Sequence, residues 1–110
     1  MAWRSSKQQE EILNTAYGIL QKELAAGVAG NDFSTIEDLF TDDSVVDAKD
    51  SYNSYYLDNF TASGSRSAVK KLSLNNVTGS FSDFRISNGT IYAEVILSYD
   101  FTVDFRKKDF

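Results

Sequence analysis

The chain contains neither histidine nor cysteine, and each absence removes a class of chemistry. Histidine is the usual general base near neutral pH and the commonest metal ligand, while cysteine supplies thiolate nucleophiles, disulfides and thiolate metal sites. Zinc and copper centres of the usual kind, and mechanisms that pair serine or cysteine with histidine, are therefore excluded within this chain. The composition favours a non-catalytic protein, and we expect it to use no cofactor.

Proline is also absent, so turns must be built from glycine, asparagine, aspartate and serine. No hydrophobic run is long enough to cross a bilayer, and there is no signal-peptide hydrophobic region. The chain does have 42% hydrophobic and 14% aromatic residues, which is enough apolar mass for a core in 110 residues. It has no internal repeat or linker, and we expect residues 1–110 to form one domain.

The formal net charge is −5 and the sequence pI is about 4.5. Because an acidic domain repels phosphate backbones, we expect no nucleic-acid partner. The one basic cluster, at residues 106–108, is interpreted as a solvated strand end.

Helical periodicity dominates the first part of the chain. A long amphipathic helix is predicted over residues 6–26, with glycines at 27 and 30 ending it. A short second helix is predicted from residue 31 to 40, with Ser34 and Glu37 at capping-box spacing. A third is predicted over 44–59, and one or two helical turns over 65–72 that Asn75 and Asn76 break. The apolar positions that carry these predictions are Ile12, Leu13, Ala16, Tyr17, Leu20, Leu24, Phe33, Ile36, Leu39, Phe40, Val45, Ala48, Tyr52, Tyr55, Tyr56 and Phe60.

From Val77 onward the pattern changes to alternation. Every odd position from Ile91 to Phe105 is apolar, which predicts a long strand with one face on a core. Asn88-Gly89 is a strong hairpin signal, because both central positions of a type I′ turn favour φ > 0. The resulting register gives Phe81 the wrong parity, so we predict a β-bulge near residues 82–83. The fold class is therefore α+β, with the long first helix and shorter helices packed on a small antiparallel sheet that ends in a long hairpin.

Three groups of residues are candidates for a site. Tyr52, Tyr55 and Tyr56 form an aromatic stripe that suits either a ligand pocket, a protein interface or core packing. Glu94, Asp100 and Asp104 share the polar face of the last strand, where carboxylates solubilise a sheet more often than they catalyse. The acidic residues Asp42, Asp43 and Asp47 are weak candidates for calcium, since the EF-hand spacing is missing and a helix N-terminus also favours negative charge.

Residues 24–46, LAAGVAGNDFSTIEDLFTDDSVV, resemble the second-helix region of nuclear-transport-factor-two-like (SnoaL-like) domains. In that family a glycine and an acidic step lead into a short helix ending in phenylalanine and acidic residues. Enzymes of the group use a pocket His or Asp, and the His is absent here. The periplasmic assembly domains of type IV secretion systems and several Gram-positive surface proteins share this fold and are not enzymes. The resemblance thus implies a non-catalytic assembly domain.

Residues 4–27 and 77–105 are similar in plan to the soluble parts of pilin-like proteins, including the tight-adherence minor pilins. Those proteins have a polar-faced N-terminal helix after a membrane segment, then a variable middle and an antiparallel sheet. This second resemblance implies a protein anchored through a segment that precedes Met1.

We therefore expect a non-catalytic assembly or protein-interaction domain, placed outside the cytoplasm in a bacterial envelope, secretion or pilus system. Its partners are proteins, first of all further copies of itself, because an unpaired long strand is a template for pairing. The last strand, residues 91–105, is the predicted interface. The alternative is a small-molecule binder or carboxylate-dependent enzyme, with a cone-shaped pocket between sheet and helices lined by the tyrosines. A calcium-stabilised domain is a third possibility.

Overall fold

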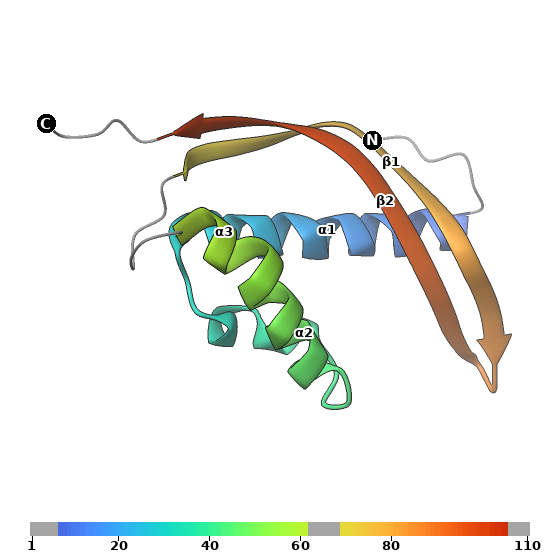
Figure 1. Cartoon of the computed structure of the whole chain (residues 1–110). Coiled ribbons are helices and arrows are strands. Elements are labelled where there is room, and N and C mark those ends of the chain that lie inside the picture. The colour runs from blue at the N-terminus through green and yellow to red at the C-terminus, as the bar shows by residue number, and fades with distance from the viewer. Residues whose placement is uncertain (1–6, 62–68, 106–110) are drawn as a thin grey trace, which may run out of the picture. The chain divides into compact units, whose positions relative to one another are not determined.

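The computed structural model describes residues 7–61 and 69–105 (Figure 1). In chain order the elements are α1 (Lys7–Ala29), the 3-10 turns η1 (Phe33–Thr35) and η2 (Glu37–Leu39), α2 (Val45–Tyr52), the π-helical turn η3 (Asn53–Leu57), α3 (Asp58–Thr61), β1 (Val69–Ser87) and β2 (Thr90–Phe105). This confirms the predicted α+β class with a long N-terminal helix and a long antiparallel hairpin. The chain forms two compact units, one from residues 1–18 and 74–101 and the other from 19–73 and 102–110.

Helix α1 ends in a glycine cap one turn later than predicted. Gly30 has φ 73, its N–H donates to the Gly27 carbonyl, and the Asn31 N–H donates to the Ala26 carbonyl. This pair of bonds is a Schellman motif, which satisfies the last carbonyls of the helix. Gly30 is therefore the stop, whereas Gly27 lies inside the helix.

Gly27 instead permits a close approach. A Cβ built on this residue would lie 2.7 Å from Cδ2 of Phe60 and 3.2 Å from Cβ of Tyr56. Only glycine lets the aromatic side chains of residues 56 and 60 approach the backbone of α1 so closely. Gly27 thus helps to pack the end of α1 in the second unit.

The core of the second unit is built around aromatic rings. Ala26, Phe33, Ile36 and Tyr52 are its buried members. The ring of Phe33 stacks on that of Phe40 at 5.6 Å between centroids and tilts against that of Tyr52 at 6.0 Å. The half-buried residues around this cluster are Leu39, Phe40, Val45, Ala48, Tyr56 and Leu57. The apolar stripes predicted for residues 33–40 and 44–59 therefore do form a core.

The segment predicted as one short helix from 31 to 40 is instead two 3-10 turns, and the capping-box prediction is wrong. Asp32 is the N-cap, and its side chain accepts a hydrogen bond from the Ser34 N–H at 3.3 Å. Ile36 leaves helical geometry with ψ 4 and separates the turns. An aspartate side chain bonds readily to a backbone N–H two residues on, which fixes a tight turn at the start.

The helix predicted over 44–59 is confirmed as an unbroken helical stretch from Val45 to Thr61, with a π-helical turn in its middle. Asn53 follows α2 with helical dihedrals, and its N–H is shared between the carbonyls of Asp50 and Lys49. A π turn inserts one extra residue and rotates the side chains that follow it. The extra residue explains why a simple 3.6-residue pattern describes this segment imperfectly.

The hairpin turns at Asn88-Gly89 as predicted, with φ 52 and 77 at the two central residues. Its first strand, however, begins at Val69 and not at Val77, so the helical turns predicted over 65–72 are wrong where the structure describes them. Residues 65–68 lie outside the described part of the chain. Pairing of β1 with β2 in the sheet satisfies backbone groups, which outweighs the local helical spacing.

Two side-chain hydrogen bonds show that β1 carries an extra residue near the predicted bulge. Ser82 Oγ donates to Glu94 Oε1 at 2.6 Å, and Asn76 Nδ2 donates to Asp100 Oδ2 at 3.2 Å. A two-residue turn with no bulge would place the members of each pair on opposite faces. The rings of Phe81 and Phe84 also meet at 5.3 Å, although residues three apart in a regular strand face opposite ways. The bulge near residues 82–83 agrees with all three contacts.

A second irregularity lies at Asn75 and Asn76, which were predicted to end a helix. Asn76 has φ 52, a left-handed conformation that asparagine tolerates better than most residues. Buried Val77 and half-buried Leu74 are three residues apart, with two exposed residues between them. The two asparagines therefore act as a second bulge within one long strand.

Within the first unit, Leu13 and Val77 are buried residues of the helix and of the hairpin respectively. The half-buried positions of β2 in this unit fall at residues 91, 95, 97 and 99, all on the predicted apolar face. Residues 7–18 of α1 are the helical part of this unit. Among the described helices, none has the length and apolar character needed to cross a membrane.

Candidate functional site

The hairpin of residues 69–105 has two outer edges, one along each strand. Over residues 69–105 the sheet consists of β1 and β2 alone, so each strand has a neighbour on one side only (Figure 1). The strands are long, with 19 residues in β1 and 16 in β2. Such edges present backbone donors and acceptors to any further strand.

The turn fixes which backbone groups of β2 point outward. In a four-residue turn over 87–90, the Ser87 carbonyl accepts a hydrogen bond from the Thr90 N–H, so the backbone N–H of Thr90 points toward β1. Along an antiparallel strand the backbone groups of successive residues point alternately toward and away from the partner strand. Those of Ile91, Ala93 and Val95 therefore point away from β1. The Glu94 carbonyl accepts a bond from Ser82 Oγ of β1 at 3.4 Å, as this alternation requires. The outer edge of β2 thus offers the backbone of its odd-numbered residues.

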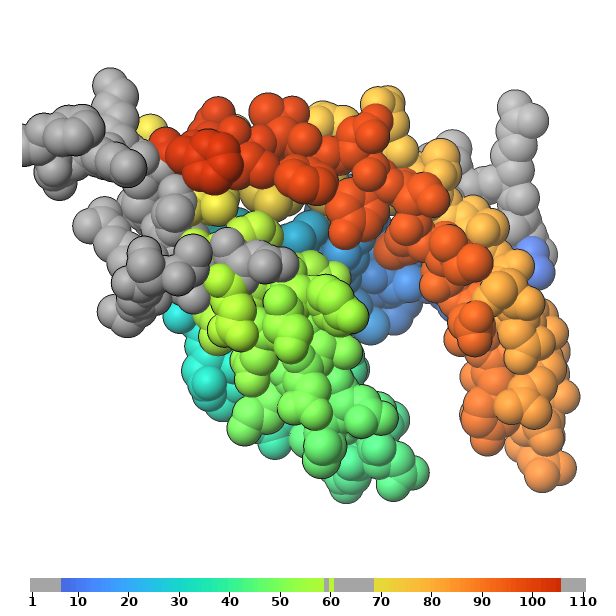
Figure 2. Space-filling view, in the orientation of Figure 1, coloured from blue at the N-terminus to red at the C-terminus, as the bar shows by residue number. Residues whose placement is uncertain are grey.

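Large apolar side chains accompany this edge. Four large hydrophobic residues of β2 are exposed: Tyr92 by 49%, Ile96 by 51%, Phe101 by 58% and Phe105 by 69%. On β1, Ile86 is the one large hydrophobic residue with comparable exposure. In Figure 2 the side chains of β2, drawn in orange to red, lie on the surface along the strand. Because side chains alternate along a strand, Tyr92 and Ile96 share one face and Phe101 and Phe105 the other, so exposed apolar groups flank this edge on both faces. We call the outer edge of β2 with these four side chains the β2 surface.

The three predicted carboxylates of β2 are spread along the strand. Glu94, Asp100 and Asp104 are all exposed, and successive members lie six and four residues apart. Glu94 accepts from Ser82 and Asp100 accepts from Asn76, so both join β2 to β1. They give the β2 surface a negative charge and no paired acid and base.

The three predicted tyrosines have different positions. Tyr52 is fully buried, and its hydroxyl donates to the Asn31 carbonyl at 2.6 Å. Tyr56 is half-buried with its ring 6.2 Å from that of Tyr52, whereas Tyr55 is 70% exposed. The stripe therefore belongs mainly to the core, with Tyr55 on the surface.

Burial controls the electrostatics around Tyr52. Burial raises the pKa of its phenol, and the charges of Asp32 and Glu23 raise it further. Burial also raises the pKa of the Glu23 carboxyl. The pKa of Asp32 is lowered, because Ser34 donates hydrogen bonds to its carboxylate. The raised pKa values of Tyr52 and Glu23 favour the neutral forms of both side chains, as expected for a packed structural region.

The acidic residues predicted as calcium candidates lie at the start of α2. Asp42 and Asp43 are exposed in the turn before the helix, and Asp47 is in its first turn. Across residues 7–61 and 69–105 no three acidic, histidine or cysteine side chains gather closely enough to hold a metal ion. Their position fits the stabilising effect of negative charge at a helix N-terminus.

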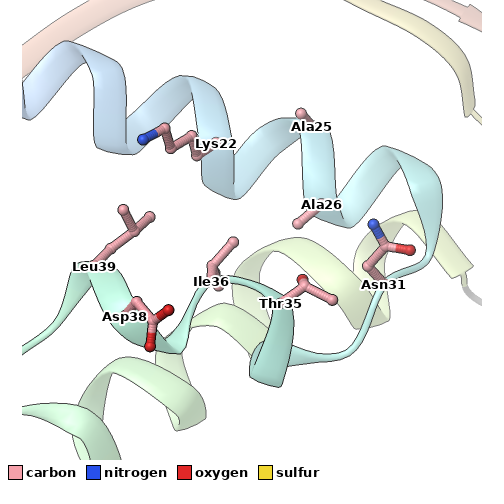
Figure 3. Close-up of a pocket in the computed structure, with 8 residues that line it drawn as sticks. All are labelled: Lys22, Ala25, Ala26, Asn31, Thr35, Ile36, Asp38 and Leu39. Atoms are coloured by element: carbon pink, nitrogen blue, oxygen red, sulfur yellow. The ribbon is translucent and has the colours of Figure 1, made fainter.

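An open cleft of about 420 Å³ lies within the second unit (Figure 3). Lys22, Ala25 and Ala26 of α1 form one wall, and Ile36 and Leu39 lie opposite. Asn31, Thr35 and Asp38 complete the lining. None of the three tyrosines lines it, and its walls are α1 and the segment after it rather than the strands. Its one carboxylate, on Asp38, is exposed.

Sequence reasoning missed two residues that shape these sites. Gly27 was interpreted as a helix stop, but it lies inside α1 and lets the side chains of residues 56 and 60 approach the helix backbone. The signal was Gly30, a second glycine three residues later that could end the helix instead. Asn76 was interpreted as a helix breaker, and its left-handed backbone instead keeps β1 in register beside Asp100. The signal for the second role was the polar pair Asn75-Asn76 directly before an alternating run.

Comparison of the chain with models of protein families, with curated proteins and with solved structures finds no match.

Proposed function

We propose that this protein is a non-catalytic assembly domain that associates with further copies of itself through the β2 surface. The observation that carries the proposal is a sheet of two long strands whose second strand combines an outer edge with four large exposed apolar side chains. A strand added at such an edge gains main-chain hydrogen bonds, and the flanking side chains provide apolar contact.

The residues available for chemistry support a role without catalysis. The chain has no histidine or cysteine, and the carboxylates of β2 are exposed and separated. Exposed carboxylates spaced along a strand are typical of solubilising groups rather than of a reaction centre. The resemblance to assembly domains and to pilin-like proteins points the same way, and it stays a prediction.

The proposal is tested by measuring mass against concentration for matched surface variants. Ile96→Lys places a charge on the β2 surface, whereas Val46→Lys places the same charge on α2, where Val46 is 68% exposed. Light scattering of the wild-type chain should give a mass that rises with concentration. The Ile96→Lys variant should stay monomeric, and the Val46→Lys variant should behave as the wild type does. A wild-type chain that remains monomeric at high concentration would refute self-association.

A further inference from the structure

The two strands of the hairpin carry opposite charge. β1 has three basic residues, Lys70, Lys71 and Arg85, and one acidic residue, Asp83, which gives a net charge of +2. β2 has three acidic residues and no basic one, which gives a net charge of −3. All of these side chains are exposed. The outer edges of the sheet are therefore electrostatically different from each other.

This difference decides which edges suit one another. Pairing β2 with β2 of a second copy would bring together six carboxylates with no cation on either strand. Pairing β1 with β1 would bring together two strands of net positive charge. Like charges on adjacent strands oppose pairing, and opposite charges favour it. Only the β1 edge of one copy against the β2 edge of another joins complementary charges.

We infer, building on the proposed function, that the partner at the β2 surface is the outer edge of β1 from a second copy of this chain. The order of charges along the strands supports this arrangement. Lys70 and Lys71 lie at the end of β1 far from the turn, and Asp104 lies at the corresponding end of β2. When copies add side by side in the same orientation, these two ends lie level, and each new strand is antiparallel to its neighbour.

Such contacts are head to tail, because each copy uses two different edges. A head-to-tail contact leaves one β1 edge and one β2 edge free at the ends of every open assembly. The assemblies should therefore grow beyond a dimer as concentration rises. A contact between two β2 edges would instead close at a dimer.

Two proline variants test the arrangement by blocking one edge each. Ala93 on β2 and Ile86 on β1 are exposed, and both have backbone N–H groups that point away from the partner strand. Proline is tolerated at such edge positions and removes one outward donor. Circular dichroism spectra and melting curves close to those of the wild type verify that each variant folds.

We expect Ile86→Pro and Ala93→Pro each to be monomeric alone, and their equimolar mixture to give a one-to-one dimer by native mass spectrometry. An Ile86→Pro variant that dimerises alone would overturn the head-to-tail contact and leave association through β2 standing. A monomeric wild type would overturn both. If a proline variant fails to fold, the salt dependence of association in the wild type decides between the head-to-tail contact and a contact between two β2 edges. Association through opposite charges weakens several-fold between about 0.05 M and about 0.5 M sodium chloride, whereas contact between two acidic edges strengthens.

Discussion

Replacing Tyr52 by phenylalanine isolates one part-buried hydrogen bond of the second unit. The phenol is fully buried and donates to the Asn31 carbonyl at 2.6 Å, directly after the glycine cap of α1. Phenylalanine keeps the ring against Phe33 and Tyr56, at 6.0 and 6.2 Å between centroids. The substitution therefore removes the hydroxyl and leaves the aromatic packing in place.

The expected loss of stability depends on whether the Asn31 carbonyl finds another hydrogen-bond donor once the Tyr52 hydroxyl is removed. An unsatisfied buried acceptor costs about 1–3 kcal/mol, and Asn31 is exposed enough for water to reach its carbonyl. We therefore expect a loss near the lower limit, about 1 kcal/mol, or about 4–8 °C in melting temperature for a domain of this size. Tyr52→Ala, which also removes the ring, should cost about 3–5 kcal/mol.

The dependence on pH provides a second test of the same bond. Because burial raises the pKa of Tyr52, the unfolded phenol ionises first as pH rises, and the wild type loses stability above pH 10. The phenylalanine variant has no such loss, so the difference in unfolding free energy should shrink as pH rises above 10. Urea unfolding followed by circular dichroism measures both effects. A difference below about 0.3 kcal/mol at pH 7, or one that does not change above pH 10, would refute the reasoning.

Three further substitutions test other parts of the structure by thermal unfolding. Gly27→Ala should lower stability by up to about 2 kcal/mol despite its better helix propensity, because its Cβ would meet Phe60 most closely; a Phe60→Leu background should reduce the penalty, with the contact to Cβ of Tyr56 remaining. Glu23→Gln should stabilise the protein at pH 7, since burial raises the pKa of this carboxyl, and the gain should vanish as pH falls below 4.5. Asn76→Ala should cost about 1–2 kcal/mol through its positive φ, whereas Asn76→Gly should lose only the bond to Asp100.

The sequence was sufficient where periodicity and turn chemistry agree. Leu13, Leu20 and Leu24 are buried along α1 as the helical spacing predicts, and the Asn88-Gly89 turn has the expected positive φ values. Even the bulge near residues 82–83 followed from parity alone, because a strand with one covered face tolerates no shift of a single residue.

It was insufficient where long-range pairing overrides local preference. Val69 and Leu72 have helical spacing, yet both belong to β1, because formation of the sheet with β2 overrides the local preference. For the candidate site, the interface on the second strand stays a prediction, and the roles of the tyrosines were not separable from sequence. Burial of Tyr52 depends on the ring of Phe33, which comes from another element and itself stacks on Phe40.

A further prediction links assembly to stability. A hairpin of two strands is only marginally stable unless one face and its edges find partners. If additional copies occupy the edges of the folded hairpin, association stabilises the folded state by mass action, and the melting temperature rises with protein concentration. We expect this rise in the wild type and in Tyr52→Phe, which melts lower at every concentration but keeps both edges. Ala93→Pro should melt at one temperature at all concentrations, and a wild-type melting temperature independent of concentration would contradict stabilisation by strand addition.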